Sequence, residues 1–218
     1  MTTEISFTEV FTSALRGVPT TVVYPTGHDP RPLPVATWSA RADAGDHALL
    51  DLCRGSTLDV GCGPGRLTLE LTRRGHHTLG VDVVAEAVLQ TRRRGASAVM
   101  ADVFDRVPEE GRWSSVLLAD GNVGIAGDPT RLLDRVREVL HPTGRAVVEV
   151  AAPGAGSSSG WTTLEGPHGR SRPFRWAHLS VDDAASVAAA AGMRVRSSHQ
   201  LTWDETAARW AVVLEATP

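Results

Sequence analysis

The chain has 218 residues, of which 42% are hydrophobic and 22% charged, which is typical of one globular domain with a full core. Its formal net charge of −3 and its pI near 6.2 give no electrostatic case for binding nucleic acid or an anionic membrane. Two cysteines are too few for a disulfide framework or a zinc site, and no apolar run approaches membrane-spanning length. We expect a cytoplasmic protein, a monomer or homodimer, that holds no metal.

The first 42 residues predict a short helix followed by an irregular arm. Ser6 and Glu9 have the spacing of a capping box, so a helix should begin there and end near Arg16. Prolines recur between residues 20 and 34, and their density excludes a regular helix. This arm either caps a ligand site or is a plain surface connection.

Residues 43–218 are predicted to form the main domain. Apolar residues from Trp38 onward predict one helix that ends at Gly55. Thr57–Arg66, reading TLDVGCGPGR, then predicts a strand, a tight glycine turn and the start of a helix. Glycine lets the backbone turn sharply and lets a ligand approach it, while the first N–H groups of the helix face that ligand.

The spacing of the three glycines distinguishes between two kinds of ligand. Folds that bind dinucleotides use G-x-G-x-x-G, with the pyrophosphate on the helix N-terminus. Here the spacing is G-x-G-x-G, and Pro64 removes a donor N–H where a pyrophosphate would need one. The turn therefore favours another nucleoside ligand over a dinucleotide.

The next three predicted strands each end in polar residues. Thr78–Asp82 ends in an acid about twenty residues past the glycines, where a carboxylate can accept from both ribose hydroxyls. NAD enzymes also bind the ribose hydroxyls with an acid at this position. Asp82 therefore indicates a ligand that contains a nucleoside, but it does not distinguish NAD from other nucleoside cofactors. Residues 97–103 form the third strand and the turn after it. Trp113–Leu118, the fourth, runs into Ala119-Asp120-Gly121-Asn122 at the switch point of the sheet, where open α/β sheets bind ligands.

The rest of the chain predicts a further helix from Asp128, a strand over 145–150, and then a long stretch without regular structure. Residues 151–178 are rich in glycine, serine and arginine, and a stretch of this length inside a compact domain is typical of a lid, a binding loop or a disordered segment. A helix over 180–191 and two strands over 193–215 follow, and their short connection predicts antiparallel pairing.

Asp59, Gly61, Gly63 and Gly65 match the first motif, (D/E)-x-G-x-G-x-G, of the class I S-adenosylmethionine-dependent methyltransferases. The chain resembles this family from about residue 43 to its C-terminus. The resemblance implies an α/β fold with a doubly wound, mostly parallel seven-stranded sheet whose antiparallel last strand is inserted between neighbours. It also implies S-adenosyl-L-methionine as the cofactor.

The resemblance assigns roles to the residues that follow the strands. An Asp at the position of Asp102 accepts from the adenine amino group, and the backbone N–H of Val103 meets a ring nitrogen. The loop that begins at Ala119 faces the methionine half of the cofactor. The expected cofactor-binding residues are Asp59, Gly61, Cys62, Gly63, Gly65, Asp82, Val83, Asp102, Val103, Ala119, Asp120 and Asn122.

The methyl acceptor is expected to be a small molecule that is methylated on oxygen, nitrogen or carbon. The chain lacks the proline pair that follows strand four in DNA amino-methyltransferases and the Pro-Cys nucleophile of cytosine C5 enzymes. If the acceptor is a hydroxyl, a general base would help, and His168, His178 and Tyr24 are candidates. No spacing marks any of them as catalytic. The aromatic residues Trp161, Phe174 and Trp176 either cover an apolar or aromatic acceptor or serve only core or lid packing.

Two other classes remain open at this point. A non-catalytic protein could keep the fold and the cofactor pocket, because no catalytic base is evident. An NAD(P)-dependent oxidoreductase is the other alternative, which the glycine spacing and the absence of any lysine, and hence of a Tyr-x-x-x-Lys pair, oppose.

Overall fold

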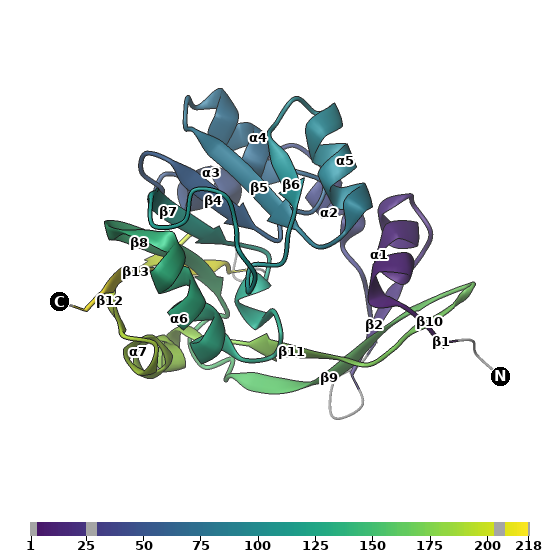
Figure 1. The fold of residues 1–218 in the computed structure, drawn as a ribbon. Coiled ribbons are helices and arrows are strands. Elements are labelled where there is room, and N and C mark those ends of the chain that lie inside the picture. Colours follow the sequence, from purple (N-terminus) through teal and green to yellow (C-terminus); the bar gives the residue numbers. More distant parts are fainter. Residues whose placement is uncertain (1–3, 25–29, 203–207, 218) are drawn as a thin grey trace.

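The computed structural model describes residues 4–24, 30–202 and 208–217. Seven of the described strands form a main sheet in the order β12-β13-β8-β7-β4-β5-β6 (Figure 1). These strands are β4 (Thr57–Val60), β5 (Thr78–Asp82), β6 (Ala98–Met100), β7 (Trp113–Leu118), β8 (Leu140–Val150), β12 (Met193–Gln200) and β13 (Trp210–Ala216). Strand β13 lies antiparallel between β12 and β8, and the other pairings are parallel. The predicted doubly wound sheet with an inserted antiparallel last strand is confirmed.

Helices cover both faces of the main sheet. They are α3 (Ala44–Leu50), α4 (Arg66–Arg73), α5 (Ala85–Arg93), α6 (Pro129–Val139) and α7 (Val181–Ala190), with a short 3-10 turn η1 (Asn122–Gly124) after β7. Side chains of a strand alternate between faces, so Val116 and Leu118 of β7 pack with the apolar residues of α6 and α7. Leu117 and Ala119 point the other way and pack with α3 and α4. The main core therefore lies in two layers around one sheet.

The segment before β4 contains two helices where the sequence predicted one. Helix α2 (Val35–Ser39) ends first, and α3 begins anew after Asp43. The Asp43 carboxylate accepts from the Asp46 N–H at 2.8 Å, and the Asp46 carboxylate accepts from the Asp43 N–H at 3.0 Å. This reciprocal capping box fixes a helix start, so the single-helix prediction was wrong.

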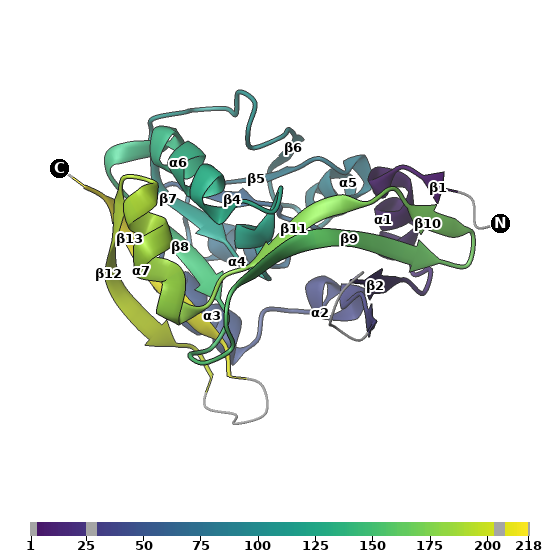
Figure 2. The same ribbon diagram turned by 90° about the horizontal axis from the view of Figure 1, so that it is seen from below.

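A second sheet lies apart from the main one and is called the lid sheet below. Its six described strands are β1 (Glu4–Ile5), β2 (Thr21–Val23), β3 (Arg31–Pro32), β9 (Ser158–Gly166), β10 (Gly169–Ser171) and β11 (Phe174–His178). Figure 2 shows β9 and β11 running side by side as a long ribbon, with β10 and β1 at its far end. The prediction that 151–177 lacks regular structure was wrong, because β9 and β11 pair antiparallel, with Phe174 opposite Thr162.

The proline-rich arm is part of the lid sheet. Strand β2 pairs antiparallel with β9, placing Val22 opposite Leu164. Residues 1–3 and 25–29 of the predicted N-terminal segment lie outside the described residues, as does the turn over 203–207. Helix α1 (Phe7–Leu15) begins at the predicted capping box and packs beside α5. It is tied there by an Arg16–Glu86 ion pair of 2.7 Å, so α1 bridges the lid sheet and the main domain.

Candidate functional site

The glycine turn follows β4 and is held by a side chain from the neighbouring strand's loop. Gly61 has a φ of +70°, and a Cβ there would lie 2.7 Å from the Asn122 amide nitrogen. That amide donates to the carbonyls of Val60 at 2.8 Å and Gly61 at 3.0 Å. A Cβ on Gly63, with a φ of +53°, would meet nothing within 4 Å. Gly61 therefore serves close packing, while the backbone at Gly63 faces open space.

Gly65 has a different role from the first two glycines. It precedes α4 as its N-cap, with a φ of +85°, and a Cβ there would lie 2.5 Å from the Thr91 hydroxyl of α5. This third glycine allows α4 and α5 to approach each other. Unlike Gly61 and Gly63, it does not line the cavity described below.

Asp82 lies at the end of β5, opposite the glycine turn. One oxygen of its carboxylate accepts from the Gly63 N–H at 3.0 Å, and the other accepts from the Val84 N–H at 2.9 Å. Burial raises the pKa of Asp82, and the two backbone donors oppose that rise. Each carboxylate oxygen has two lone pairs, so each can accept one further hydrogen bond from a ligand.

A buried carboxylate, Asp59, lies beneath the same turn. It is 2% exposed and accepts from the Thr68 hydroxyl at 2.6 Å. Burial, with smaller contributions from the nearby carboxylates of Asp120 and Asp82, raises the pKa of Asp59 to about 7. The side chain therefore changes charge near neutral pH, which is unusual for an aspartate and typical of functional sites.

Arg66 connects the glycine turn to the loop after β7, a role that the sequence analysis did not assign. Its guanidinium donates to both carboxylate oxygens of Asp120 at 2.7 Å and pairs with the fully buried Asp46. Asp120 has a φ of +52°, which is uncommon for a residue other than glycine. Burial raises the pKa of Asp120, and Arg66 opposes that rise. The position of Arg66 directly after the third glycine was the available signal.

These groups line one end of a cavity of about 570 Å³. The cavity brings together all but one of the residues predicted to bind the cofactor, Gly65 being the exception. Those that line it are Asp59, Gly61, Cys62, Gly63, Asp82, Val83, Asp102, Val103, Ala119, Asp120 and Asn122. They come from the carboxyl ends of β4, β5, β6 and β7, the edge at which open α/β sheets bind ligands.

The lid sheet lines the other end of the cavity. Phe174, Trp176 and His178 alternate along β11, as side chains on one face of a strand do. Thr162 and Leu164 of β9 and Val22 and Tyr24 of the arm line it too. Tyr24, Phe174, Trp176 and His178 were predicted near the acceptor from the sequence, whereas Val22, Thr162 and Leu164 were not. The alternation of Phe174, Trp176 and His178 is the sequence signal for their common face.

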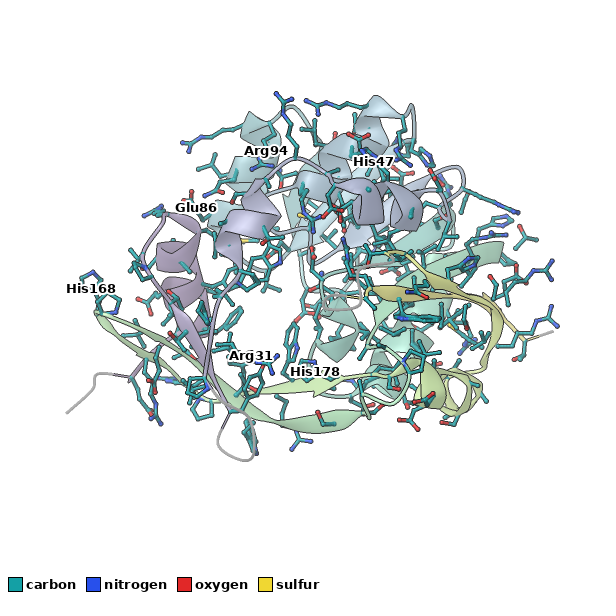
Figure 3. All side chains as sticks on the ribbon, turned by 180° about the vertical axis from the view of Figure 1, so that it is seen from behind. Arg31, His47, Glu86, Arg94, His168 and His178 are labelled. Atoms are coloured by element: carbon teal, nitrogen blue, oxygen red, sulfur yellow. The ribbon has the colours of Figure 1, made fainter. Side chains whose placement is uncertain are left out.

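The three candidate bases have different positions. Tyr24 and His178 both line the cavity, with ring centroids 6.1 Å apart. Burial raises the pKa of Tyr24. Figure 3 shows His178 near the middle of the molecule and His168 at the far tip of the lid sheet, in the exposed turn between β9 and β10. His168 is thus separated from the cavity lining.

Neither a metal-binding cluster nor a membrane-spanning helix is present in the part of the chain that the structure describes. In the ranges 4–24, 30–202 and 208–217, no three or more His, Cys, Asp or Glu side chains are grouped so that they could hold a metal ion. Over the same ranges, no helix combines the length and apolar character needed to cross a membrane.

Known proteins share this architecture. Residues 57–144 match a family model described as a methyltransferase domain. An S-adenosylmethionine-dependent methyltransferase from Bacteroides fragilis, crystallised with S-adenosyl-L-homocysteine, superposes with a TM-score of 0.80 at 16% identity, covering 100% of this chain and 99% of that one. The chain therefore shares the fold of the class I S-adenosylmethionine-dependent methyltransferases, and its residues 57–144 resemble a methyltransferase domain.

Two further proteins similar to this chain are methyltransferases named for their acceptor or their pathway. A 1,6-didemethyltoxoflavin-N1-methyltransferase from Burkholderia thailandensis has a TM-score of 0.59 at 20% identity, with 84% of this chain and 81% of that chain covered. A ubiquinone biosynthesis O-methyltransferase from Xylella fastidiosa is 30% identical over 97 residues, which are 42% of this chain. The matched region spans about two fifths, 39%, of that relative's length.

Proposed function

We propose that this chain is a cytoplasmic enzyme that transfers a methyl group from S-adenosylmethionine to a small-molecule acceptor. The observation that carries the proposal is the continuous cavity of about 570 Å³. The glycine turn and its acids line one end, and the lid sheet lines the other. A cavity that joins both ends can hold two reactants in contact, which is the main requirement for a displacement between bound molecules.

The glycine end of the cavity suits S-adenosylmethionine better than a dinucleotide. It carries the carboxyl groups of Asp59, Asp82, Asp102 and Asp120, with Arg66 as the cation beside them. Such a wall attracts the sulfonium and ammonium groups of S-adenosylmethionine and repels the pyrophosphate of NAD. The open space at Gly63 lets the ligand approach the backbone closely.

Individual residues would hold separate parts of the cofactor. Asp82 would accept from the ribose hydroxyls and Asp102 from the adenine amino group, while the Val103 N–H would meet a ring nitrogen. Ala119 and Asn122, in the loop after β7, would contact the methionine half. When bound, S-adenosylmethionine supplies an electrophilic methyl group on a positively charged sulfur.

Residues 1–42 and the lid sheet would act together as a cap that excludes water and orients the acceptor. This proposal rests on the pairing of β2 with β9 and on the cavity-lining side chains of both segments. If the acceptor is a hydroxyl, its proton would pass to the imidazole of His178. Because burial raises the pKa of Tyr24, its phenol keeps its proton near neutral pH and would orient the acceptor by hydrogen bonding.

A transfer assay tests this function. The purified chain is incubated with S-adenosylmethionine carrying a radiolabelled methyl group and with small-molecule extracts, and the products are separated from the cofactor. We expect label in a product of the extract, and less label with an Asp82→Ala variant at limiting cofactor. If the chain binds S-adenosylhomocysteine but transfers label to no acceptor, the proposal of an enzyme is contradicted, and a non-catalytic binding protein of the same fold is supported instead.

A further inference from the structure

Five aromatic rings form a continuous wall at the lid end of the cavity. The ring centroids of Trp38 and Phe11 are 5.8 Å apart, those of Phe11 and Phe7 are 5.3 Å apart, and those of Phe7 and Phe174 are 4.8 Å apart. Trp176 continues the series, 6.3 Å from Phe174. All five side chains line the cavity, although they come from α1, α2 and β11. Three separate elements thus converge to build one apolar surface.

The contacts within this wall show what kind of surface it is. Each ring packs directly on the next, either stacked, tilted or edge-on. An aromatic cage for an ammonium group requires rings that face one another across a gap, with the cation over their faces. Rings in mutual contact instead present an extended surface, and aliphatic side chains line the cavity beside it, namely Val22, Leu33, Ile125 and Leu164. This surface matches a flat ligand that stacks on one or more rings.

The distribution of charge also separates the two ends of the cavity. Among the described lining residues, the acids are Asp59, Asp82, Asp102 and Asp120, and all four lie on the main-sheet side. The lid side contributes Arg175, whose guanidinium stacks over the Trp161 ring at 5.6 Å. A cationic acceptor moved from water to the aromatic wall would lose its hydration without gaining a carboxylate partner there. The wall therefore disfavours cations.

The polar groups at the lid end lie near the site of transfer. Trp176 of β11 forms an antiparallel bridge with Ile125, the residue just after η1. His178 lies two residues further along β11. Tyr24 lies beside His178, with ring centroids 6.1 Å apart. A ligand that stacks on Trp176 can thus present a polar substituent to this pair, next to the loop assigned to the methionine half of the cofactor.

We propose that the acceptor is a flat, uncharged aromatic compound whose hydroxyl group is directed toward Tyr24 and His178. The aromatic wall stacks the ring system, and the lid side selects against cationic molecules of the same shape. This inference rests on the proposed methyl-transfer function and defines the chemical class of its substrate.

Calorimetric titrations with three bicyclic probes test the inference. The chain is first titrated with S-adenosylhomocysteine, and the saturated protein is then titrated with 2-naphthol, protonated 2-naphthylmethylamine or saturated decahydro-2-naphthol. We expect 2-naphthol to bind at least tenfold more tightly than either of the others. Equal or tighter binding of the amine would overturn the selection against cations, and equal binding of the saturated alcohol would overturn the aromatic wall. Failure of 2-naphthol to bind would overturn the inference as a whole.

The first titration separates this inference from the function on which it rests. Absence of S-adenosylhomocysteine binding would contradict the proposed function, whereas normal binding with no preference among the probes would contradict only the substrate class. Two tryptophans of the lid sheet then provide a matched pair of variants. Trp176 lines the cavity, while Trp161, on the neighbouring strand, is 54% exposed.

Trp176→Leu is expected to weaken 2-naphthol binding by roughly three- to tenfold, the effect of one aromatic contact, and to leave S-adenosylhomocysteine binding unchanged. Trp161→Leu should change neither. If Trp176→Leu does not fold, Phe7→Leu tests the same wall from α1. Equal effects of the cavity-lining variant and Trp161→Leu would show that the wall does not bind the probe.

Discussion

Asp82 is the side chain whose removal tests the cofactor site most sharply. Its carboxylate is oriented by the N–H groups of Gly63 and Val84, at 3.0 and 2.9 Å, so both oxygens have fixed positions at the cavity wall. We predict that Asp82→Ala weakens the binding of S-adenosylhomocysteine, because the two ribose hydroxyls lose their acceptor. The perturbation is local, since the strand that carries Asp82 is paired on both sides.

The magnitude of the loss follows from the charge and partial burial of the carboxylate. A hydrogen bond to a charged group contributes about 1.5–3 kcal/mol, and water competes for a side chain that is only partly buried. Loss of both ribose contacts should therefore cost on the order of 1–3 kcal/mol, a fall in affinity of roughly fivefold to 150-fold. Asp134→Ala removes an exposed carboxylate from α6 and provides a control with the same change in net charge.

The assay is calorimetric titration of both variants and of the unmodified chain, repeated with S-adenosylhomocysteine that lacks the ribose 2′-hydroxyl. The unmodified chain should bind the deoxy compound roughly tenfold more weakly, the effect of one charge-assisted hydrogen bond. In Asp82→Ala this difference should nearly disappear, because the partner of the hydroxyl is already gone. An equal loss in both proteins would refute the assignment of Asp82 to the ribose.

Three further changes test the turn, the buried acid and the buried ion pair. Gly61→Val should abolish S-adenosylhomocysteine binding in calorimetry, because its side chain would collide with Asn122; Gly111→Val, with a similar φ of +74° in open space, should retain binding. Burial raises the pKa of Asp59 to about 7, so the folded chain keeps a proton on this carboxyl that the unfolded chain loses from about pH 4 upward. The free energy of unfolding therefore falls as the pH rises from about 4 toward 7. Between pH 5 and pH 8, the free energy of unfolding of Asp59→Asn, measured in urea, should therefore rise by roughly 2–3 kcal/mol relative to that of the unmodified chain. If the two proteins show parallel dependences of this free energy on pH, the explanation is contradicted. Arg66→Met leaves the Asp120 carboxylate without its cation and leaves the buried Asp46 with Arg209 as its remaining cation, so the free energy of unfolding should fall by roughly 3 kcal/mol, whereas a change below 1 kcal/mol would show that the pairs contribute little.

The main sheet and the cofactor end of the site could be predicted because their signals are local. Asp82 ends an apolar strand, Asp102 and Asp120 each lie two residues past the end of one, and the carboxyl ends of parallel strands meet at one edge. The orientation of Asp120 could not be predicted in the same way. It depends on a positive φ and on Arg66, which approaches from the helix after the glycine turn.

The lid sheet could not be predicted for a different physical reason. Strand β2 over Thr21–Val23 pairs with Thr163–Glu165, and such a pairing between distant segments leaves no pattern in either one alone. The alternation from Phe174 to His178 was readable, but the run of glycine and serine before β9 indicated a loop. The aromatic wall was equally hidden, because its rings meet only after α1 and β11 have docked.

Calorimetric titration of the purified chain with S-adenosylhomocysteine, with NADH as the parallel ligand, tests the central claim most directly. The acid-lined glycine end of the cavity predicts micromolar binding of S-adenosylhomocysteine and no binding of NADH. Binding of NADH alone would contradict the assignment of the turn from Asp59 to Gly65. Binding of neither ligand would contradict the proposal that this cavity holds a nucleoside cofactor.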